Sequence, residues 1–203
     1  MYDKNDFWAQ KARKEGYPAR SVYKLIEIDA KFRLFPKVPA GAPFKVLDLG
    51  AAPGSWSLYA LRRLGAGGSL CACDLGPLSG SAEGLFDDAR FFFLQGDFTT
   101  PESRAIIAGR APFQLVLSDA APLTSGNRSV DVLRSLDLAE NALSIAEQCL
   151  ESGARLVIKI FQGCGSAEFL KKARLLFDEL KTFKPTSCRA NSFETYIIGL
   201  GKR

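Results

Sequence analysis

The stretch "VLDLGAAPGSW", residues Val46–Trp56, joins a short apolar run to a glycine turn and the start of a helix. Gly50 and Gly54 let the backbone approach a ligand at the carboxyl end of the run, where ligands bind in open α/β sheets. The turn reads G-A-A-P-G, so it lacks both the G-x-G-x-x-G of a dinucleotide site and the G-K-[ST] of a P-loop. We therefore expect a nucleoside-like ligand rather than a phosphate-bearing one.

Short apolar runs alternate with helical patterns on both sides of this stretch. The runs that we interpret as strands are residues 44–49, 68–75, 89–98, 113–122, 154–163, 182–190 and 193–202. This alternation predicts a Rossmann-like α/β fold, in which a mostly parallel, doubly wound sheet has helices on both faces. The last two runs have no helix between them, and they predict a final antiparallel strand in a seven-stranded sheet.

Helical periodicity accounts for most of the remaining chain. Residues 5–14 and 19–32 predict two basic helices, the first with Asn5 as its N-cap. Residues 129–153 and 166–181 predict two amphipathic helices, and a further helix begins near Ser55. We expect a single domain over residues 1–203, in which basic N-terminal helices (1–40) precede a Rossmann-like core (41–203).

Charge is distributed unevenly along the chain, which has a formal net charge of +5. Residues 1–40 carry nine Lys/Arg and five Asp/Glu, residues 41–154 carry eight and thirteen, and residues 155–203 carry ten and four. Two basic ends suit a polyanion such as nucleic acid. The side chains expected to contact phosphates are Lys11, Arg13, Lys14, Arg20, Lys31, Arg33, Lys171, Lys172, Lys184 and Arg189.

Composition restricts the class of protein and its chemistry. No apolar run reaches the ~18 residues of a membrane span, and the first ten residues have no signal-peptide core, so we expect a cytoplasmic protein. The five cysteines include no CxxC pair, which argues against disulfides and a metal site. The chain has no histidine, so acid–base chemistry must use carboxylates, lysines, tyrosines or cysteines.

Three successive strand runs end in aspartate, at Asp74, Asp97 and Asp119. At the ligand edge of the sheet, Asp74 can accept from both ribose hydroxyls of a nucleoside, and Asp97 from an adenine amino group. Aspartates also cap turns and helices, and either interpretation suits any one of them alone. Three together, beside the glycine turn, favour S-adenosylmethionine, which has these groups and a positive sulfonium.

The apolar run "ARLVIKIFQG", residues 154–163, contains a lysine in its middle, Lys159. Lysine is rarely buried without a partner, although a strand lysine can also extend its amine out of a sheet end. The residue is therefore a candidate for acid–base chemistry in a chain without histidine.

Taken together, these stretches resemble the FtsJ/RrmJ (RlmE) family of S-adenosylmethionine-dependent ribose 2′-O-methyltransferases. The matching stretches, in family order, are "ARSVYKL", "VLDLGAAPGSW", "ACDL", "FLQGDF", "LSDAAPLTSG", "LVIKIFQG" and "KPTSCRANSFETYIIGLG". The resemblance implies a Lys-Asp-Lys-Glu catalytic tetrad of Lys24, Asp119, Lys159 and Glu194. With the glycine turn, it implies a cofactor site at Gly50, Gly54, Trp56, Asp74, Asp97 and Asp119.

The resemblance also implies the reaction, which is methyl transfer from S-adenosylmethionine to a ribose 2′-hydroxyl of RNA. For compact members the substrate is a uridine in the A loop of large-subunit (23S) rRNA; a tRNA or cap ribose is the alternative. Lys159 is expected to act either as a neutral base or as a cation that stabilises the forming alkoxide. We further expect a monomer with no membrane partner.

Motifs disfavour other enzyme classes. The missing G-x-G-x-x-G argues against an NAD-dependent oxidoreductase, and "SDAAP" is not the N/D-P-P-Y of an amino-group methyltransferase. A cytosine-C5 enzyme needs a nucleophilic cysteine near Asp119, where the sequence has none. A non-catalytic RNA-binding module of the same fold is the rival from another class, and it would not need the tetrad.

Overall fold

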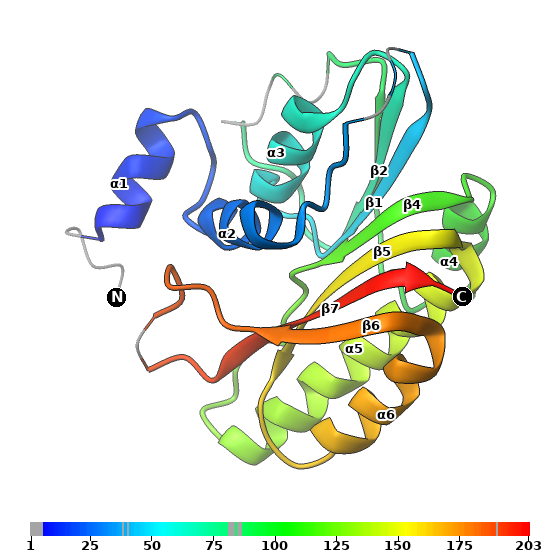
Figure 1. Cartoon of the computed structure of the whole chain (residues 1–203). Coiled ribbons are helices and arrows are strands. Elements are labelled where there is room, and N and C mark those ends of the chain that lie inside the picture. The colour runs from blue at the N-terminus through cyan, green and yellow to red at the C-terminus, as the bar shows by residue number, and fades with distance from the viewer. Residues whose placement is uncertain (1–5, 38, 40, 81–83, 85–86, 190) are drawn as a thin grey trace.

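A seven-stranded sheet runs through the part of the chain that the computed structural model describes, residues 6–37, 39, 41–80, 84, 87–189 and 191–203. The strands are β1 (Phe44–Leu49), β2 (Gly68–Asp74), β3 (Phe91–Gln95), β4 (Phe113–Ser118), β5 (Leu150–Phe161), β6 (Phe177–Phe183) and β7 (Glu194–Lys202). Their spatial order is β3-β2-β1-β4-β5-β7-β6 (Figure 1). Strand β7 runs antiparallel to both of its neighbours, β5 and β6, and the other neighbouring strands pair parallel. The prediction of a mostly parallel sheet with a final antiparallel strand is confirmed.

Helices cover both faces of this sheet (Figure 1). The helices are α1 (Phe7–Lys14), α2 (Val22–Phe32), α3 (Ser55–Arg63), α4 (Pro101–Ala108), α5 (Arg128–Cys149) and α6 (Ser166–Leu176). Of these, α1 packs against α2 rather than on the sheet (Figure 1). Side chains alternate between two cores: Leu117 and Val157 pack with α2 and α3, while Val116 and Ile158 pack with α5 and α6. Within the described residues, no helix is both long and apolar enough to cross a membrane.

Two of the predicted helices are too long. The helix predicted over residues 129–153 ends at Cys149, and β5 begins at Leu150. The helix predicted over residues 166–181 ends at Leu176, and Phe177 begins β6. Phe177 fits an apolar helix face by spacing, but it pairs with Lys202 of β7 and is buried against Gly199. Strand pairing therefore overrides the local helical pattern. Residues 184–189, predicted as strand, are not part of a strand, and Ala190, the last residue of that prediction, lies outside the described residues.

The first helix has a different cap from the predicted one. The Asp6 side chain accepts hydrogen bonds from the backbone N–H of Trp8, at 3.1 Å, and of Ala9, at 3.2 Å. These bonds satisfy free donors in the first turn of α1. Asn5, the predicted cap, lies outside the described residues.

The glycine turn after β1 lies directly against the segment that follows β4. Gly50 has φ +75°, and a Cβ built on it would lie 2.6 Å from the Cα of Ala120. No side chain fits this space, and L-residues disfavour this backbone conformation. Gly50 therefore keeps the turn close to Asp119, which precedes Ala120.

We expect Gly50→Ala to lower the free energy of unfolding by about 2–5 kcal/mol, because left-handed strain adds to a backbone clash. Urea unfolding measures this change. Gly65→Ala is the matched control, because a Cβ at Gly65 meets nothing within 4 Å. Equal unfolding midpoints for the two variants would contradict the close packing of the turn.

Candidate active site

Lys159 and Asp119 meet at the carboxyl ends of two adjacent parallel strands. Ser118 of β4 pairs with Ile158 of β5, so the residues that follow them lie side by side. The Lys159 Nζ lies 3.0 Å from Asp119 Oδ1 and also donates to the main-chain oxygen of Asp119. The two side chains are only 7% and 15% exposed. The lysine in the apolar strand therefore has a carboxylate partner, as burial requires.

Tyr196 completes the contacts of Asp119. It lies opposite Lys159 in the β5–β7 ladder, and its hydroxyl donates to Asp119 Oδ1 at 2.8 Å. Burial, with the negative charges of Asp119 and Glu194, raises the pKa of Tyr196 well above its usual value of 10.0, so the phenol keeps its proton. Sequence reasoning missed this residue, although Glu194 and Tyr196 share one face of β7 by their spacing of two.

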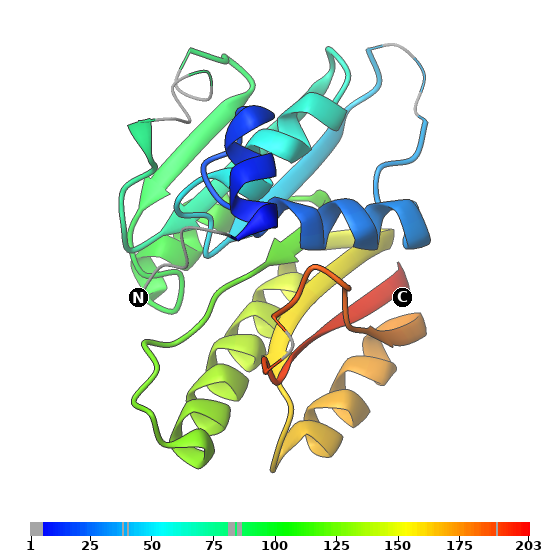
Figure 2. The same cartoon turned by 90° about the vertical axis from the view of Figure 1, so that its left-hand side faces the viewer.

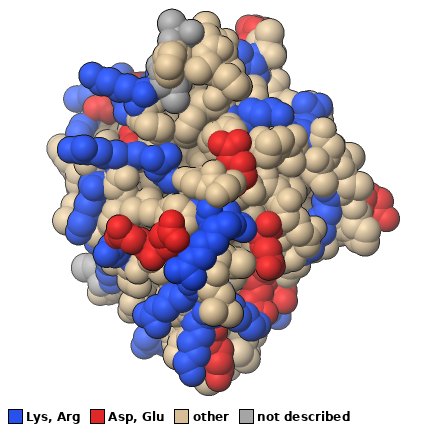
Figure 3. Space-filling view, turned by 45° about the vertical axis from the view of Figure 1, so that its right-hand side comes forward, with Lys and Arg blue, Asp and Glu red and all other residues tan. Residues whose placement is uncertain are grey.

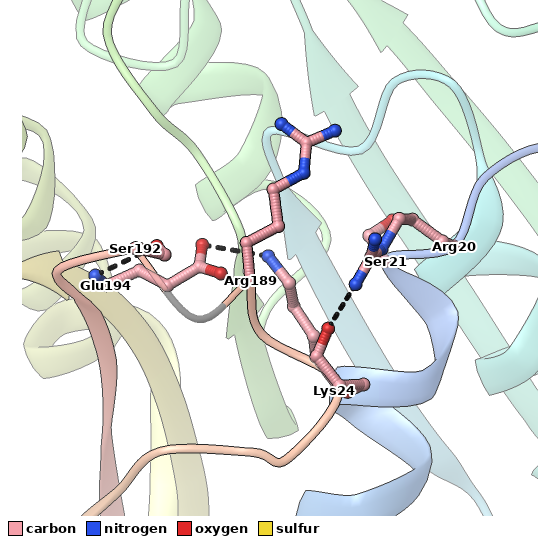
Figure 4. Close-up of a pocket in the computed structure, with 7 residues that line it drawn as sticks. Arg20, Ser21, Lys24, Arg189, Ser192 and Glu194 are labelled. Carbon is pink, nitrogen blue, oxygen red and sulfur yellow. Dashed lines mark hydrogen bonds and ion pairs between the residues drawn. The ribbon is translucent and has the colours of Figure 1, made fainter. Parts of the chain in front are cut away.

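Lys24 and Glu194 form a second ion pair from opposite ends of the chain. Lys24 of α2 points toward Glu194 at the start of β7, with 2.8 Å between Nζ and Oε2 (Figure 4). Their side chains are 12% and 10% exposed. Burial lowers the pKa of Lys24, but the carboxylates of Asp119 and Glu194 outweigh it, and the net pKa lies above the usual value. Lys24 is therefore a cation at neutral pH.

The structure brings the four predicted tetrad residues together from α2, β5, β7 and the end of β4. Burial raises the pKa of Asp119, but the charges of Lys159 and Lys24 and the hydrogen bond from Tyr196 outweigh it, so the net pKa lies below 3.8. Asp119 is therefore a carboxylate at neutral pH, stabilised by the positive charges of both lysines.

A cavity of about 440 Å³ opens beside Asp119 at the carboxyl ends of the strands. Four predicted cofactor residues line it: Gly50, Asp74, Asp97 and Asp119. Its other lining residues, which sequence reasoning missed, are Ala52, Leu75, Phe98, Thr99, Ala120, Ala121, Asp137 and Leu138. Its size and mixed lining suit a nucleoside-sized ligand.

The carboxylates of this cavity are held in place by backbone groups. Asp74 accepts from the N–H of Ala52, at 2.9 Å, and of Gly76, at 2.8 Å, through different oxygens. Asp97 accepts from the N–H of Thr99 at 2.8 Å. A carboxylate oxygen can accept two bonds, so Asp74 keeps acceptor capacity for a pair of hydroxyls.

Two predicted cofactor residues, Gly54 and Trp56, do not line the cavity. Gly54 is the N-cap residue before α3 and has φ +106°. Trp56 is buried, donates from Nε1 to the carbonyl of Ser21 at 2.8 Å, and packs 5.8 Å from the Tyr196 ring. Trp56 thus connects the turn segment to the start of α2 and to the tetrad, while direct contact with a cofactor stays a prediction for both residues.

Asp48, within the glycine-turn stretch, is a fully buried carboxyl group. The Ser57 hydroxyl donates to one oxygen at 2.6 Å, while the other has no hydrogen-bond partner. Burial, with the charges of Asp119 and Asp74, raises the pKa of Asp48 to about 7. Sequence reasoning treated this residue only as part of a strand.

A second, smaller pocket of about 220 Å³ lies on the Lys24–Glu194 side of the tetrad (Figure 4). Its lining residues are Arg20, Ser21, Lys24, Ser187, Arg189, Ser192 and Glu194. Three cations and three hydroxyls make this pocket suitable for an anionic, hydroxyl-bearing ligand. The tetrad therefore lies between a cavity lined by carboxylates and a pocket lined mainly by basic and hydroxyl groups.

This architecture is that of a Rossmann-like methyltransferase. A Plasmodium falciparum structure, described as a candidate ribosomal RNA methyltransferase, aligns with a TM-score of 0.74 at 24% identity, over 92% of this chain and 98% of that one. Human methyltransferase-like protein 13, solved in complex with SAH, aligns with a TM-score of 0.60 at 13% identity, over 88% and 81%.

Sequence comparison identifies the family. The model of the FtsJ-like methyltransferases matches residues 17–202, and this chain belongs to that family. It is 46% identical to the ribosomal RNA large subunit methyltransferase E of Treponema denticola, over 98% of this chain and 96% of that protein. It is 44% identical to the protein of the same name from Nitratidesulfovibrio vulgaris strain DP4, over 98% and 93%.

Proposed function

We propose that this protein transfers a methyl group from S-adenosylmethionine to the 2′-hydroxyl of a uridine ribose in 23S rRNA. The observation that carries the proposal is the tetrad, with its two ion pairs, between a nucleoside-sized cavity and a basic pocket. The relatives named ribosomal RNA large subunit methyltransferase E support the choice of RNA.

The carboxylate-lined cavity suits S-adenosylmethionine. Asp74 would accept from the ribose hydroxyls, Asp97 from the adenine amino group, and Asp119 would lie near the sulfonium. Gly50 leaves room where a Cβ would clash with Ala120. Bound there, the cofactor supplies a methyl group activated by a positively charged sulfur.

In this proposal Lys159 lies beside the reacting hydroxyl and Asp119 orients it. Two positions of the tetrahedral Nζ face oxygens of Asp119, which leaves another position for the substrate. As a neutral amine, Lys159 accepts the hydroxyl proton there; as a cation, it stabilises the alkoxide while the proton leaves to solvent. In either case an O–C bond forms, the C–S bond breaks, and a thioether is released.

The basic pocket beside Lys24 and Glu194 is the proposed contact with the RNA strand. Lys172, another predicted phosphate contact, pairs with Glu140 at 2.9 Å and does not line this pocket. Lys and Arg side chains lie interspersed with Asp and Glu on the face drawn in Figure 3. Arg20, which also pairs with Asp6, and Arg189 both line the pocket beside Lys24, so we place the RNA contact there rather than over the whole of both basic ends.

The proposal predicts which RNA becomes labelled. The protein is incubated with methyl-labelled S-adenosylmethionine and, separately, with assembled large ribosomal subunits, bulk tRNA and capped mRNA. We expect label on a uridine 2′-oxygen of the large-subunit rRNA, with Lys159→Ala as the inactive control. Label only in tRNA or caps would reassign the substrate. Cofactor binding with no labelled RNA would favour a non-catalytic module.

A further inference from the structure

One side of the α2 region contacts the segment that leads into β7. Arg20, Lys24 and Glu27 are spaced i, i+4, i+7. They bond to Ser187, to Glu194, and to Thr186 and Ser187, respectively. Figures 1 and 2 show this segment beside α2 in both views. Arg20 donates to the Ser187 carbonyl at 2.6 Å. The catalytic pair of Lys24 and Glu194 therefore lies within a larger contact between the two ends of the chain.

Glu27 makes the densest set of bonds in this contact. Its Oε2 accepts from the N–H of Thr186, at 2.7 Å, and from the Thr186 hydroxyl, at 2.8 Å, while Oε1 accepts from the N–H of Ser187 at 2.9 Å. Burial raises the pKa of Glu27, but these hydrogen bonds outweigh it and hold the pKa below its usual value. The ionised carboxylate of Glu27 thus binds two successive residues through charge-assisted hydrogen bonds.

Thr186 and Ser187 lie shortly before Glu194 in the sequence. The far end of the same segment is fixed by Lys184, which donates to the Ser192 carbonyl at 2.6 Å, and by Ser192, which accepts from the N–H of Glu194 at 3.2 Å. Glu27 lies one helical turn after Lys24. Thr186 and Ser187 therefore dock on α2 one helical turn from Lys24, while Glu194, farther along the chain, is also held by its pairing with Phe161 of β5.

We propose that Glu27 is a positioning residue, which docks Thr186 and Ser187 on α2 and so helps to hold Lys24 and Glu194 in register for the reaction. The proposal rests on the proposed function, because it assigns the pair a role in that reaction. Nothing in it requires Glu27 to touch the substrate.

The docking can be tested without RNA. In Glu27→Gln we expect faster amide hydrogen exchange at Thr186 and Ser187, and a Lys24 amine that titrates at lower pH by ¹⁵N NMR, because Glu194 is held less closely. Glu179→Gln is the matched control: that exposed carboxylate pairs with Lys181 at 3.1 Å in β6 and should change neither readout. Unchanged exchange and titration in Glu27→Gln would overturn the docking role.

The catalytic consequence is tested by single-turnover methyl transfer. We expect Glu27→Gln to slow transfer by about 10–100-fold at unchanged cofactor affinity, as misplacement by about 1 Å can do. In a Lys24→Ala background, Glu27→Gln should slow transfer by less than about threefold, because the Lys24–Glu194 pair is already lost. Equal losses in both backgrounds would overturn the positioning role. A wild-type protein that methylates no RNA would instead overturn the proposed function, while exchange and titration still judge the docking.

Discussion

Replacing Lys159 with alanine is expected to abolish methyl transfer and to leave S-adenosylmethionine binding within a few-fold of wild type. The Nζ of Lys159 bonds to Asp119, but the side chain does not line the proposed cofactor cavity. Removal of a group that handles the proton or its charge costs ~10²–10⁴-fold in rate. Single-turnover transfer measures the loss, and calorimetric titration measures the affinity for the cofactor.

Two further variants make this result specific. Lys181→Ala removes an exposed lysine of β6, paired with Glu179, and should keep the wild-type rate. Lys159→Arg keeps the charge but cannot act as a neutral base, because arginine stays protonated. Partial activity in a folded Lys159→Arg protein favours the cationic role. A complete loss of activity in that protein favours the neutral base. Wild-type turnover in Lys159→Ala would remove Lys159 from the mechanism.

The parts of the site that local sequence could predict are those that local geometry fixes. A parallel strand that ends in a turn delivers its last residues to the ligand edge, so Asp74, Asp97 and Asp119 were predicted to lie together. All three line the cavity. The same reasoning placed Gly50 at the cavity wall, where its backbone conformation excludes a side chain.

What sequence reasoning missed depends on contacts between distant parts of the chain. Tyr196 bonds to Asp119, 77 positions away, and Glu27 bonds to Thr186, 159 positions away. In neither case does the local sequence around one residue indicate its distant partner. Sequence reasoning also missed that the Trp56 ring packs against Tyr196 and bonds to the Ser21 carbonyl before α2, while its contact with a cofactor stays a prediction. The predicted end of α6 was wrong for a related reason. The pairing of β6 with β7 determines where the helix ends, and local periodicity does not.

Asp119→Asn is expected to be as inactive as Lys159→Ala and, unlike it, to weaken cofactor binding. Asp119 lines the proposed cofactor cavity and holds both Lys159 and Tyr196, so one change affects both sites. Asparagine keeps the shape but removes the negative charge that Lys159 and Lys24 stabilise. Loss of one partner of a buried ion pair costs about 3–5 kcal/mol of unfolding free energy, which urea titration measures at neutral pH.

The pH dependence of stability separates the charge of Asp119 from its shape. Because the pKa of folded Asp119 lies below 3.8, its stabilisation is complete above that pH and is lost as the pH falls through the folded-state value. The deficit of Asp119→Asn relative to wild type should therefore be largest at neutral pH and should shrink below about pH 4. Carboxylates that do not interact with Asp119 titrate alike in both proteins and cancel in the difference, whereas Asp48, whose pKa of about 7 Asp119 helps to raise, affects the comparison only near neutral pH. A deficit independent of pH would mean that Asp119 acts through shape and hydrogen bonds, and that its charge contributes nothing to stability.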